Sequence, residues 1–495
     1  MTAPRPDNIA PLATATTTRR RGSPWLALMW VTAAGIASLV ICSDDARPVV
    51  APIVVIVLTI GIFVVLLPGD RRTAPLAEVG MWHALAVAVY SVLPMLTFVA
   101  LGLRYTPLND ARLYGLQPDA RLVARVGWMQ ATYLVAFTTS YLVVAGRTAV
   151  PNRAEVHVRS SLAWGATILL IASLLAGIGI RLYYGADAAS YTDSYRAIAA
   201  LPLGVRQLLR LLTGPQLIYW LVLLTWAFEK YAKRRAIIFA LIAAVLVTTV
   251  VGRGSRANLA LLVVASVLLY HRMVSPISYL RGALLGTTAL LLFTTLGLVR
   301  QLSSPTAFDA GRLATSGEFE ALFANDIDLL TRKAWHQLPR PSARQFASEI
   351  LAPVPSQMLP FDKLDQSNWY VQTFYPTVGA AGGGFAFGVI AQALVGFGVP
   401  ELVFRGLIAG LLLASIRRVH ARRGRGLWPL VAYTWFSIMA YHSFRSGTLY
   451  PLGLFVHDFI AGYLLLVVLA MVLHRAGRPH RPSAGPAVPY HAPTT

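Results

Sequence analysis

Long apolar runs alternate with short polar segments along almost the whole chain. A helix of about 20 apolar residues is long enough to cross a bilayer. The runs therefore predict about twelve transmembrane helices and an all-α polytopic integral membrane protein. The expected spans are residues 25–41, 49–67, 79–103, 126–145, 162–184, 211–228, 236–250, 257–270, 282–299, 398–416, 427–441 and 452–473.

Both ends of the chain lack this apolar pattern. Residues 1–24 are polar and end near a run of arginines, and residues 476–495 are rich in proline. We expect both segments to be disordered tails that flank a membrane domain at residues 25–475. Basic residues gather after alternate spans, and positive charge favours the cytoplasmic side, so both termini are expected in the cytoplasm.

The composition narrows the class of protein further. The chain is 56% hydrophobic and 13% charged, and its net charge of +22 comes almost wholly from arginine. Because the basic residues lie between apolar runs, we interpret them as topological signals and expect the lipid bilayer, and no nucleic acid, as a partner. The arginine-rich, lysine-poor usage indicates a high-GC bacterium, and hence a multi-pass protein of a bacterial cytoplasmic membrane.

Motifs for metals and nucleotides are missing from the sequence. A single cysteine, Cys42, leaves no cysteine metal site, and there is no HExxH pair. A Walker loop and a Rossmann fingerprint are also absent. We therefore expect no metal and no cofactor.

One long hydrophilic loop, residues 300–378, is expected on the external side. Apolar residues recur at helical spacing within residues 318–336, which predicts an amphipathic helix lying on the membrane face. Asp326 and Asp328 resemble a DxD metal pair, but on a helix they diverge by about 200°. We interpret them as part of a solvated helix face.

The glycine-led segment that follows the loop is expected to enter the membrane without crossing it. Five arginines after residues 398–416 must be cytoplasmic, so an odd number of crossings separates them from external Arg300. Residues 382–395 are therefore predicted to be a re-entrant or interfacial helix. Such backbone needs a wet or protein-lined cavity, which indicates a substrate site.

Arginines at the external ends of the spans are the candidate binding residues. Arg253 and Arg256 lie in a glycine-bearing turn between two apolar runs, and guanidinium groups suit phosphate oxygens. We predict a diphosphate clamp there, to which Arg300 and Arg445 would add; an ordinary loop with snorkelling arginines is the alternative.

Two histidines are candidate general bases on the same face. His336 and His442 are expected to be external, and imidazole accepts a proton near neutral pH. Histidines at a membrane interface, or a carboxylate of the loop as the base, are the alternatives. The proline-rich stretch 352–363 ends in Asp362 and Lys363, which are candidate loop contacts to a substrate.

The order of these pieces resembles the Wzy-type oligosaccharide repeat-unit polymerases, which are relatives of the O-antigen ligases. The resemblance covers residues 236–475. It rests on Gly254-Ser255-Arg256 before an apolar span, Gly297-Leu298-Val299-Arg300, the proline-rich stretch 353–363, the glycine-rich segment up to Gly396-Phe397-Gly398, and the late Arg445.

This resemblance implies a GT-C-like membrane fold of the ligase and polymerase branch. It also implies metal-independent glycosyl transfer between two undecaprenyl-diphosphate-linked oligosaccharides, one the donor and one the acceptor. A chain-length regulator protein is a further implied partner.

Three other functions remain open from the sequence. A ligase would use the same donor with a different acceptor. A glycosyltransferase that uses polyprenyl-phosphate sugars would match Asp44-Asp45, although only a short loop separates the first two expected spans. A transporter of lipid-linked glycans would show internal repeats, and we find none.

Overall fold

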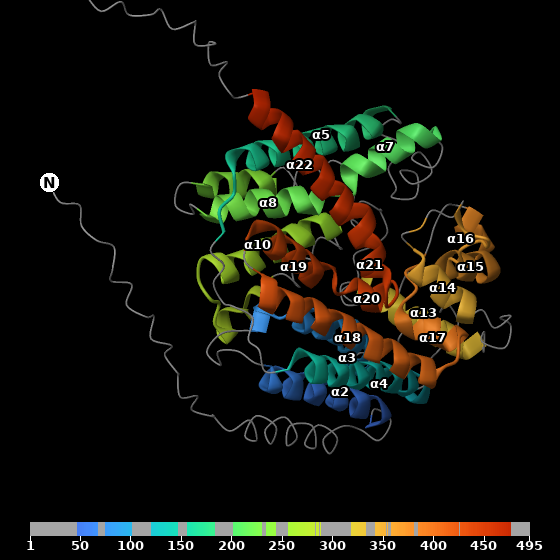
Figure 1. Ribbon diagram of the computed structural model, residues 1–495. Coiled ribbons are helices and arrows are strands. Elements are labelled where there is room, and N and C mark those ends of the chain that lie inside the picture. The colour runs from blue at the N-terminus through green and yellow to red at the C-terminus, as the bar shows by residue number, and fades with distance from the viewer. Residues whose placement is uncertain are drawn as a thin grey trace, which may run out of the picture.

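The computed structural model describes most of the membrane domain, as a series of separate residue ranges. The described residues are 47–67, 75–100, 120–146, 156–183, 201–229, 234–243, 256–282, 284–286, 288, 318–332, 342–352, 354, 358–380, 385–424 and 426–476. They are helical and contain no sheet (Figure 1). The predicted tails lie outside the described residues, except for Ala476, which is the last residue of a described helix.

Six described helices are long and apolar enough to cross a membrane, which makes the protein a multi-pass membrane protein. They are Arg47–Leu66, Val79–Val99, Ser160–Gly179, Gly204–Glu229, Val399–Arg423 and Tyr450–Arg475. Two shorter apolar helices, Leu261–Met273 and Leu427–Met439, lie at two further expected spans. Spans expected at 25–41, 236–250 and 282–299 lie wholly or partly outside the described residues, so the total of twelve stays a prediction.

The long helices form two layers with a pair of helices between them (Figure 1). The first layer contains α2 (Arg47–Leu66), α3 (Val79–Ala100), α4 (Ala120–Ala145) and α18 (Val399–Arg423). The second contains α5 (Ser160–Tyr183), α8 (Gln216–Glu229) and α22 (Ala461–Ala476). Between the layers lie α10 (Arg256–Met273) and α19 (Leu427–Met439).

Small residues bring α4 and α18 into backbone contact. A Cβ atom on Gly406 would lie 2.7 Å from the Tyr133 carbonyl oxygen, and one on Gly410 would lie 2.4 Å from the Phe137 carbonyl oxygen. Membrane helices lack a hydrophobic drive toward one another, so they associate through such close packing at small residues. The Gly406–Gly410 pair, four residues apart, therefore fixes α18 against α4.

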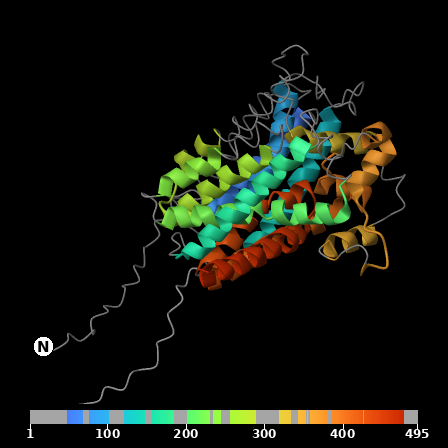
Figure 2. The ribbon, with the colours of Figure 1, turned by 90° about the horizontal axis from the view of Figure 1, so that it is seen from above.

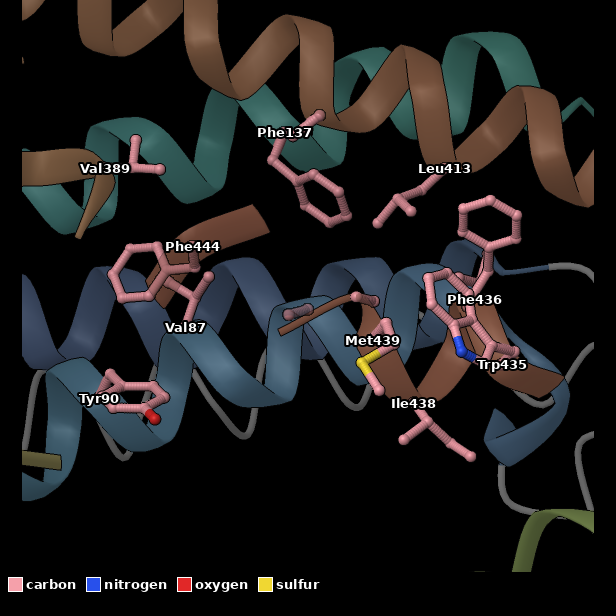
Figure 3. Close-up of a cluster of buried hydrophobic side chains, with 14 of the residues drawn as sticks. Val87, Tyr90, Phe137, Val389, Leu413, Trp435, Phe436, Ile438, Met439 and Phe444 are labelled. Atoms are coloured by element: carbon pink, nitrogen blue, oxygen red, sulfur yellow. The ribbon is translucent and has the colours of Figure 1, made fainter. Parts of the chain in front are cut away.

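Apolar side chains from several elements fill the space behind this contact (Figure 3). Phe137 of α4 and Leu413 of α18 are fully buried in one cluster with Val87 of α3.

Short connecting helices complete the bundle. The helix α7 (Leu203–Thr213) precedes α8. The helices α20 (His442–Arg445) and α21 (Tyr450–Leu454) lead through a π-helical turn, Phe455–Ile460, into α22.

The helices of the long loop gather at one end of the bundle, which we call the loop end (Figures 1 and 2). They are α13 (Glu318–Arg332), α14 (Ser342–Ile350), α15 (Gln366–Phe374) and α16 (Pro376–Ala380). The short helix α17 (Val389–Val395) follows, and all seven of its residues are buried. The opposite end, where α18 finishes, we call the Arg417 end.

The position predicted for α13 was wrong. The helix forms where expected, but residues 322–330 are buried without interruption, and α13 packs against α3, α4 and α17 instead of lying on an open membrane face. Asp326 and Asp328 are 2% and 0% exposed, so the prediction of a solvated face was also wrong. Asp328 is satisfied by hydroxyl donors, Tyr370 at 2.6 Å and Tyr375 at 2.7 Å.

We predict that Gly410→Ala destabilises the protein by about 1–3 kcal/mol, because the new methyl group must push α18 away from α4. Thermal unfolding of the purified protein in detergent would measure this. Gly177→Ala in α5 is the matched control, since nothing lies within 4 Å of its added Cβ. Equal melting temperatures for the two variants would contradict the close α4–α18 contact.

Candidate functional site

A buried arginine in the apolar helix α18 is the centre of a charged cluster at the loop end. Arg405 is 0% exposed. Its Nε donates to Glu401 Oε1 at 2.8 Å, and its Nη1 donates to Glu349 Oε1 at 2.9 Å and to Thr448 Oγ1 at 3.3 Å. A lone charge at this depth would cost several kcal/mol, and the two carboxylates offset that cost by pairing with the guanidinium group. We call Glu349, Glu401, Arg405 and Thr448 the Arg405 cluster.

The two carboxylates of this cluster come from different parts of the fold. Glu401 lies in the first turn of α18, where the helix dipole favours negative charge, and its Oε2 also accepts from the Phe397 backbone N–H at 2.8 Å. Glu349 lies in the loop helix α14 and its side chain is 14% exposed. The Arg405–Glu349 ion pair therefore ties the long loop to the membrane bundle.

A tight turn after α20 adjoins the Arg405 cluster. Gln392 of α17 donates through Nε2 to the Ser446 carbonyl at 3.2 Å. Gly447 has a φ of +141°, and a Cβ atom there would lie 3.1 Å from Gln392 Nε2 and 3.6 Å from the Glu349 carboxyl carbon. Glycine is needed at this position because the backbone lies in the left-handed region and its neighbours are close.

The short helix α20 carries two of the predicted site residues, His442 and Arg445. The His442 ring packs on Tyr441 and Tyr450, with centroid distances of 4.1 and 5.4 Å, and its Nδ1 lies 3.0 Å from Ser446 Oγ. Burial, and then the positive charge of Arg445, lower the pKa of His442 to about 3. The imidazole is therefore neutral at pH 7 and able to accept a proton.

The other predicted site residues are only partly described. Arg253, Arg300 and His336 lie outside the described residues, and Arg256 is known only as the first residue of α10.

Asp362 and Lys363 hold the loop together. Arg344 donates to the Asp362 carbonyl oxygen through Nε at 3.0 Å and Nη2 at 2.9 Å. Lys363 Nζ donates to the carbonyl oxygens of Ala352 and Val354. These bonds fasten the proline-rich stretch to itself, so the ammonium group of Lys363 is engaged by its own loop.

The sequence interpretation missed Arg405, Glu401 and Glu349. Arg405 lies inside the span expected at 398–416, and an ionisable residue within a membrane span is by default a candidate for function. Glu401, four residues before Arg405, is at the spacing of a helical ion pair. The contribution of Glu349 depends on how the long loop folds back and had no local signal.

A second charged cluster lies at the Arg417 end and holds helices together. Arg417 donates to Glu78 through Nε at 2.6 Å and Nη2 at 3.1 Å, and to the Ala145 carbonyl at 2.9 Å. Tyr141 donates to Glu78 Oε2 at 3.0 Å. These bonds join the starts and ends of α3, α4 and α18, and we interpret them as structural. In the described part of the chain no group of three or more His, Cys, Asp or Glu residues is arranged to hold a metal ion.

No protein-family model, curated protein or solved structure matches the chain.

We predict that Arg405→Met destabilises the protein by about 3–5 kcal/mol, because it leaves the buried Glu401 and the partly buried Glu349 without a cation. Thermal unfolding in detergent would detect the loss. Arg418→Met is the control, since Arg418 is exposed at the other end of the same helix. If the two variants unfold at the same temperature, the Arg405 cluster does not hold the loop to the bundle.

Proposed function

We propose that the protein is a glycosyltransferase that joins oligosaccharide repeat units carried on undecaprenyl diphosphate, at the external face of a bacterial cytoplasmic membrane. The transfer would need no metal. The observation that supports this most directly is the position of His442 and Arg445 on one short helix, α20, which contacts α17 and leads into the turn at Gly447 beside the Arg405 cluster.

The distribution of basic residues supports an external position for the loop end. α18 finishes with a group of arginines at the Arg417 end: Arg417, Arg418, Arg422 and Arg423. Positive residues next to spans favour the cytoplasm. The loop end would then face outwards, where carrier-linked glycans are assembled without nucleotides.

The chemistry of α20 suits transfer from a diphosphate leaving group. The acceptor sugar hydroxyl would attack the anomeric carbon of the donor sugar, forming a new C–O bond while the bond to the diphosphate breaks and its electrons pass to the leaving group. Arg445 would stabilise the negative charge that develops there. His442 would take the proton of the attacking hydroxyl through Nε2, which has no hydrogen-bond partner among the described residues.

A bound diphosphate would also improve His442 as a base. In the free protein the nearby Arg445 cation disfavours the imidazolium form. A diphosphate next to Arg445 would offset that charge and raise the pKa of His442 toward its ordinary value. Binding of the donor and activation of the base would thus be coupled through one residue.

Arg445→Gln should abolish polymer formation, because the leaving diphosphate loses a charge-assisted contact. The assay gives purified protein a lipid-linked oligosaccharide in detergent, with chelator and without nucleotide, and measures glycan length on the carrier. Wild-type protein and the Arg418→Gln control should give a ladder of repeat multiples. An unchanged monomer with the wild-type protein would refute the polymerase function.

His442→Gln should lower kcat by about 10²–10⁴-fold if His442 is the general base. With a pKa of about 3, His442 is deprotonated throughout the neutral range, and the base is lost only as pH falls through that value. The parameter kcat/KM reports the ionisation of the free enzyme. We therefore expect that protonation of His442 does not lower the kcat/KM of the wild type between pH 7 and about pH 4. An acidic limb near pH 6.5 that disappears in the variant would contradict the buried, neutral state of His442.

A further inference from the structure

Buried polar side chains at the loop end carry atoms without hydrogen-bond partners among the described residues. Gln130 of α4 is 0% exposed and neither its Oε1 nor its Nε2 is paired. The hydroxyl groups of Ser91 in α3 and Ser443 in α20 are also fully buried and unpaired. Asn325 of α13 and Gln392 of α17 each donate to a backbone carbonyl and keep an unpaired amide oxygen. We call these five residues the polar cluster.

The elements that carry the polar cluster pack on one another around Phe444. α13 contacts α3, α4 and α17, and α20 contacts α3 and α17. The Phe444 ring lies 6.1 Å from Tyr90, which precedes Ser91, and 5.5 Å from Tyr133, one turn after Gln130. In the view of Figure 3, Phe444 lies between Val389 of α17 and Tyr90 of α3.

A glycine allows this close approach. A Cβ atom on Gly388, just before α17, would lie 3.3 Å from the Phe444 carbonyl oxygen and 3.2 Å from the Leu322 side chain of α13. The three elements α13, α17 and α20 therefore meet at one point. The unpaired groups of Asn325, Gln392 and Ser443 come from these same three elements.

Unpaired buried polar groups are unfavourable, and most of all within a membrane protein. Each has given up its hydrogen bonds to water without gaining a protein partner, and the surrounding lipid offers none. Several such groups on mutually packed elements oppose folding and indicate a ligand that completes their bonding. All five groups are neutral amides or hydroxyls, so they match a ligand rich in hydroxyl groups better than an ion.

We propose that the polar cluster binds the sugar next to the diphosphate of the lipid-linked oligosaccharide. This inference rests on the proposed function. Ser443 of the polar cluster and the diphosphate ligand Arg445 lie on the same short helix, α20. A sugar is bonded directly to its diphosphate, so one short helix would contact both parts of the donor.

The division of contacts follows from the chemistry of the groups. The amide oxygens of Asn325 and Gln392 would accept from sugar hydroxyls, while Gln130 would both donate and accept. Arg445 would bind the carrier diphosphate whichever sugar is attached. The polar cluster would therefore set the preference for a sugar-bearing carrier over the bare carrier.

Gln130→Leu tests this inference, because the substitution keeps a similar volume and removes the unpaired amide. The probes are undecaprenyl diphosphate and the same lipid bearing glucose, galactose or N-acetylglucosamine, and the protein is held in lipid nanodiscs. We expect the wild type to bind at least one sugar-bearing lipid about tenfold more tightly than the bare lipid, the scale of a few hydrogen bonds. In Gln130→Leu this preference should fall several-fold while the melting temperature rises. Ser443→Ala should reduce the preference as well.

Thr434→Val is the matched control. Thr434 is a buried hydroxyl without a partner in the described residues, but it lies in α19, next to Tyr433 at the Arg417 end. This variant should also melt higher, with the sugar preference unchanged.

Four results would overturn the inference, and they differ from failure of the proposed function. An unchanged sugar preference in Gln130→Leu would show that the Gln130 amide does not contact the sugar. A melting temperature of Gln130→Leu below that of the wild type would show that the amide already has hydrogen-bond partners in the free protein. Equal loss of preference in Thr434→Val would mean that the effect is not local. Wild-type protein that binds bare and sugar-bearing lipids equally, through Arg445, would refute the sugar site alone. Wild-type protein that binds none of these lipids would refute the proposed function itself.

Discussion

The ion pairs of Arg405 are the constraint on which the loop end depends. Arg405 is buried in an apolar helix, and its charge is tolerated because Glu401 supplies one carboxylate from the same helix and Glu349 supplies another from the long loop. The second bond has a structural consequence. If the loop moved away from the bundle, Arg405 would lose Glu349, one of its two carboxylate partners, while remaining buried. The free-energy cost of that loss favours the observed position of α14 and of the turn at Gly447.

α18 is thus held at both ends by arginine and glutamate. Arg417 lies twelve residues after Arg405, about 18 Å further along the helix, and pairs with Glu78 next to the start of α3. Between the two pairs, Gly406 and Gly410 bring the backbone of α18 onto α4. Electrostatic contacts fix the position of the helix along its axis, while the glycines fix its distance from α4. The short helix α17 packs against α18 and in turn contacts α20.

Where the structure describes the helices, their spans were readable from the sequence, because apolar length is a local property. The spans expected at 79–103, 126–145 and 452–473 coincide closely with Val79–Ala100, Ala120–Ala145 and Tyr450–Arg475. The helix at 318–332 was also predicted from its periodicity. The buried location of this helix was not predicted, because periodicity identifies an apolar face but does not show which residues cover the polar face. Tyr370 and Tyr375, more than forty positions further on, satisfy Asp328 and allow α13 to be buried.

The candidate site was predicted in part for the same reason. His442 and Arg445 followed a span and could be assigned to the external side, and the structure places them on one helix. Arg405 was missed because a single charge changes the mean hydropathy of a long apolar run very little. The free-energy cost of a charged side chain within a membrane span is nevertheless a signal for a functional residue. Glu349 and the polar cluster depend on contacts between distant segments, which no local pattern encodes.

The two kinds of buried polar group at the loop end point to different roles. The Arg405 cluster contains two carboxylates around one guanidinium and is tied to the loop, which suits a structural device that positions α14 and the turn beside it. The polar cluster carries no formal charge, and its unpaired atoms make the folded protein less stable than apolar residues of the same size would. Groups that weaken the fold in this way persist where a bound molecule needs them. The Arg405 cluster stabilises the position of the loop against the bundle. The polar cluster lowers the stability of the folded protein until a bound ligand supplies the missing hydrogen bonds. The two clusters therefore have complementary roles at the loop end.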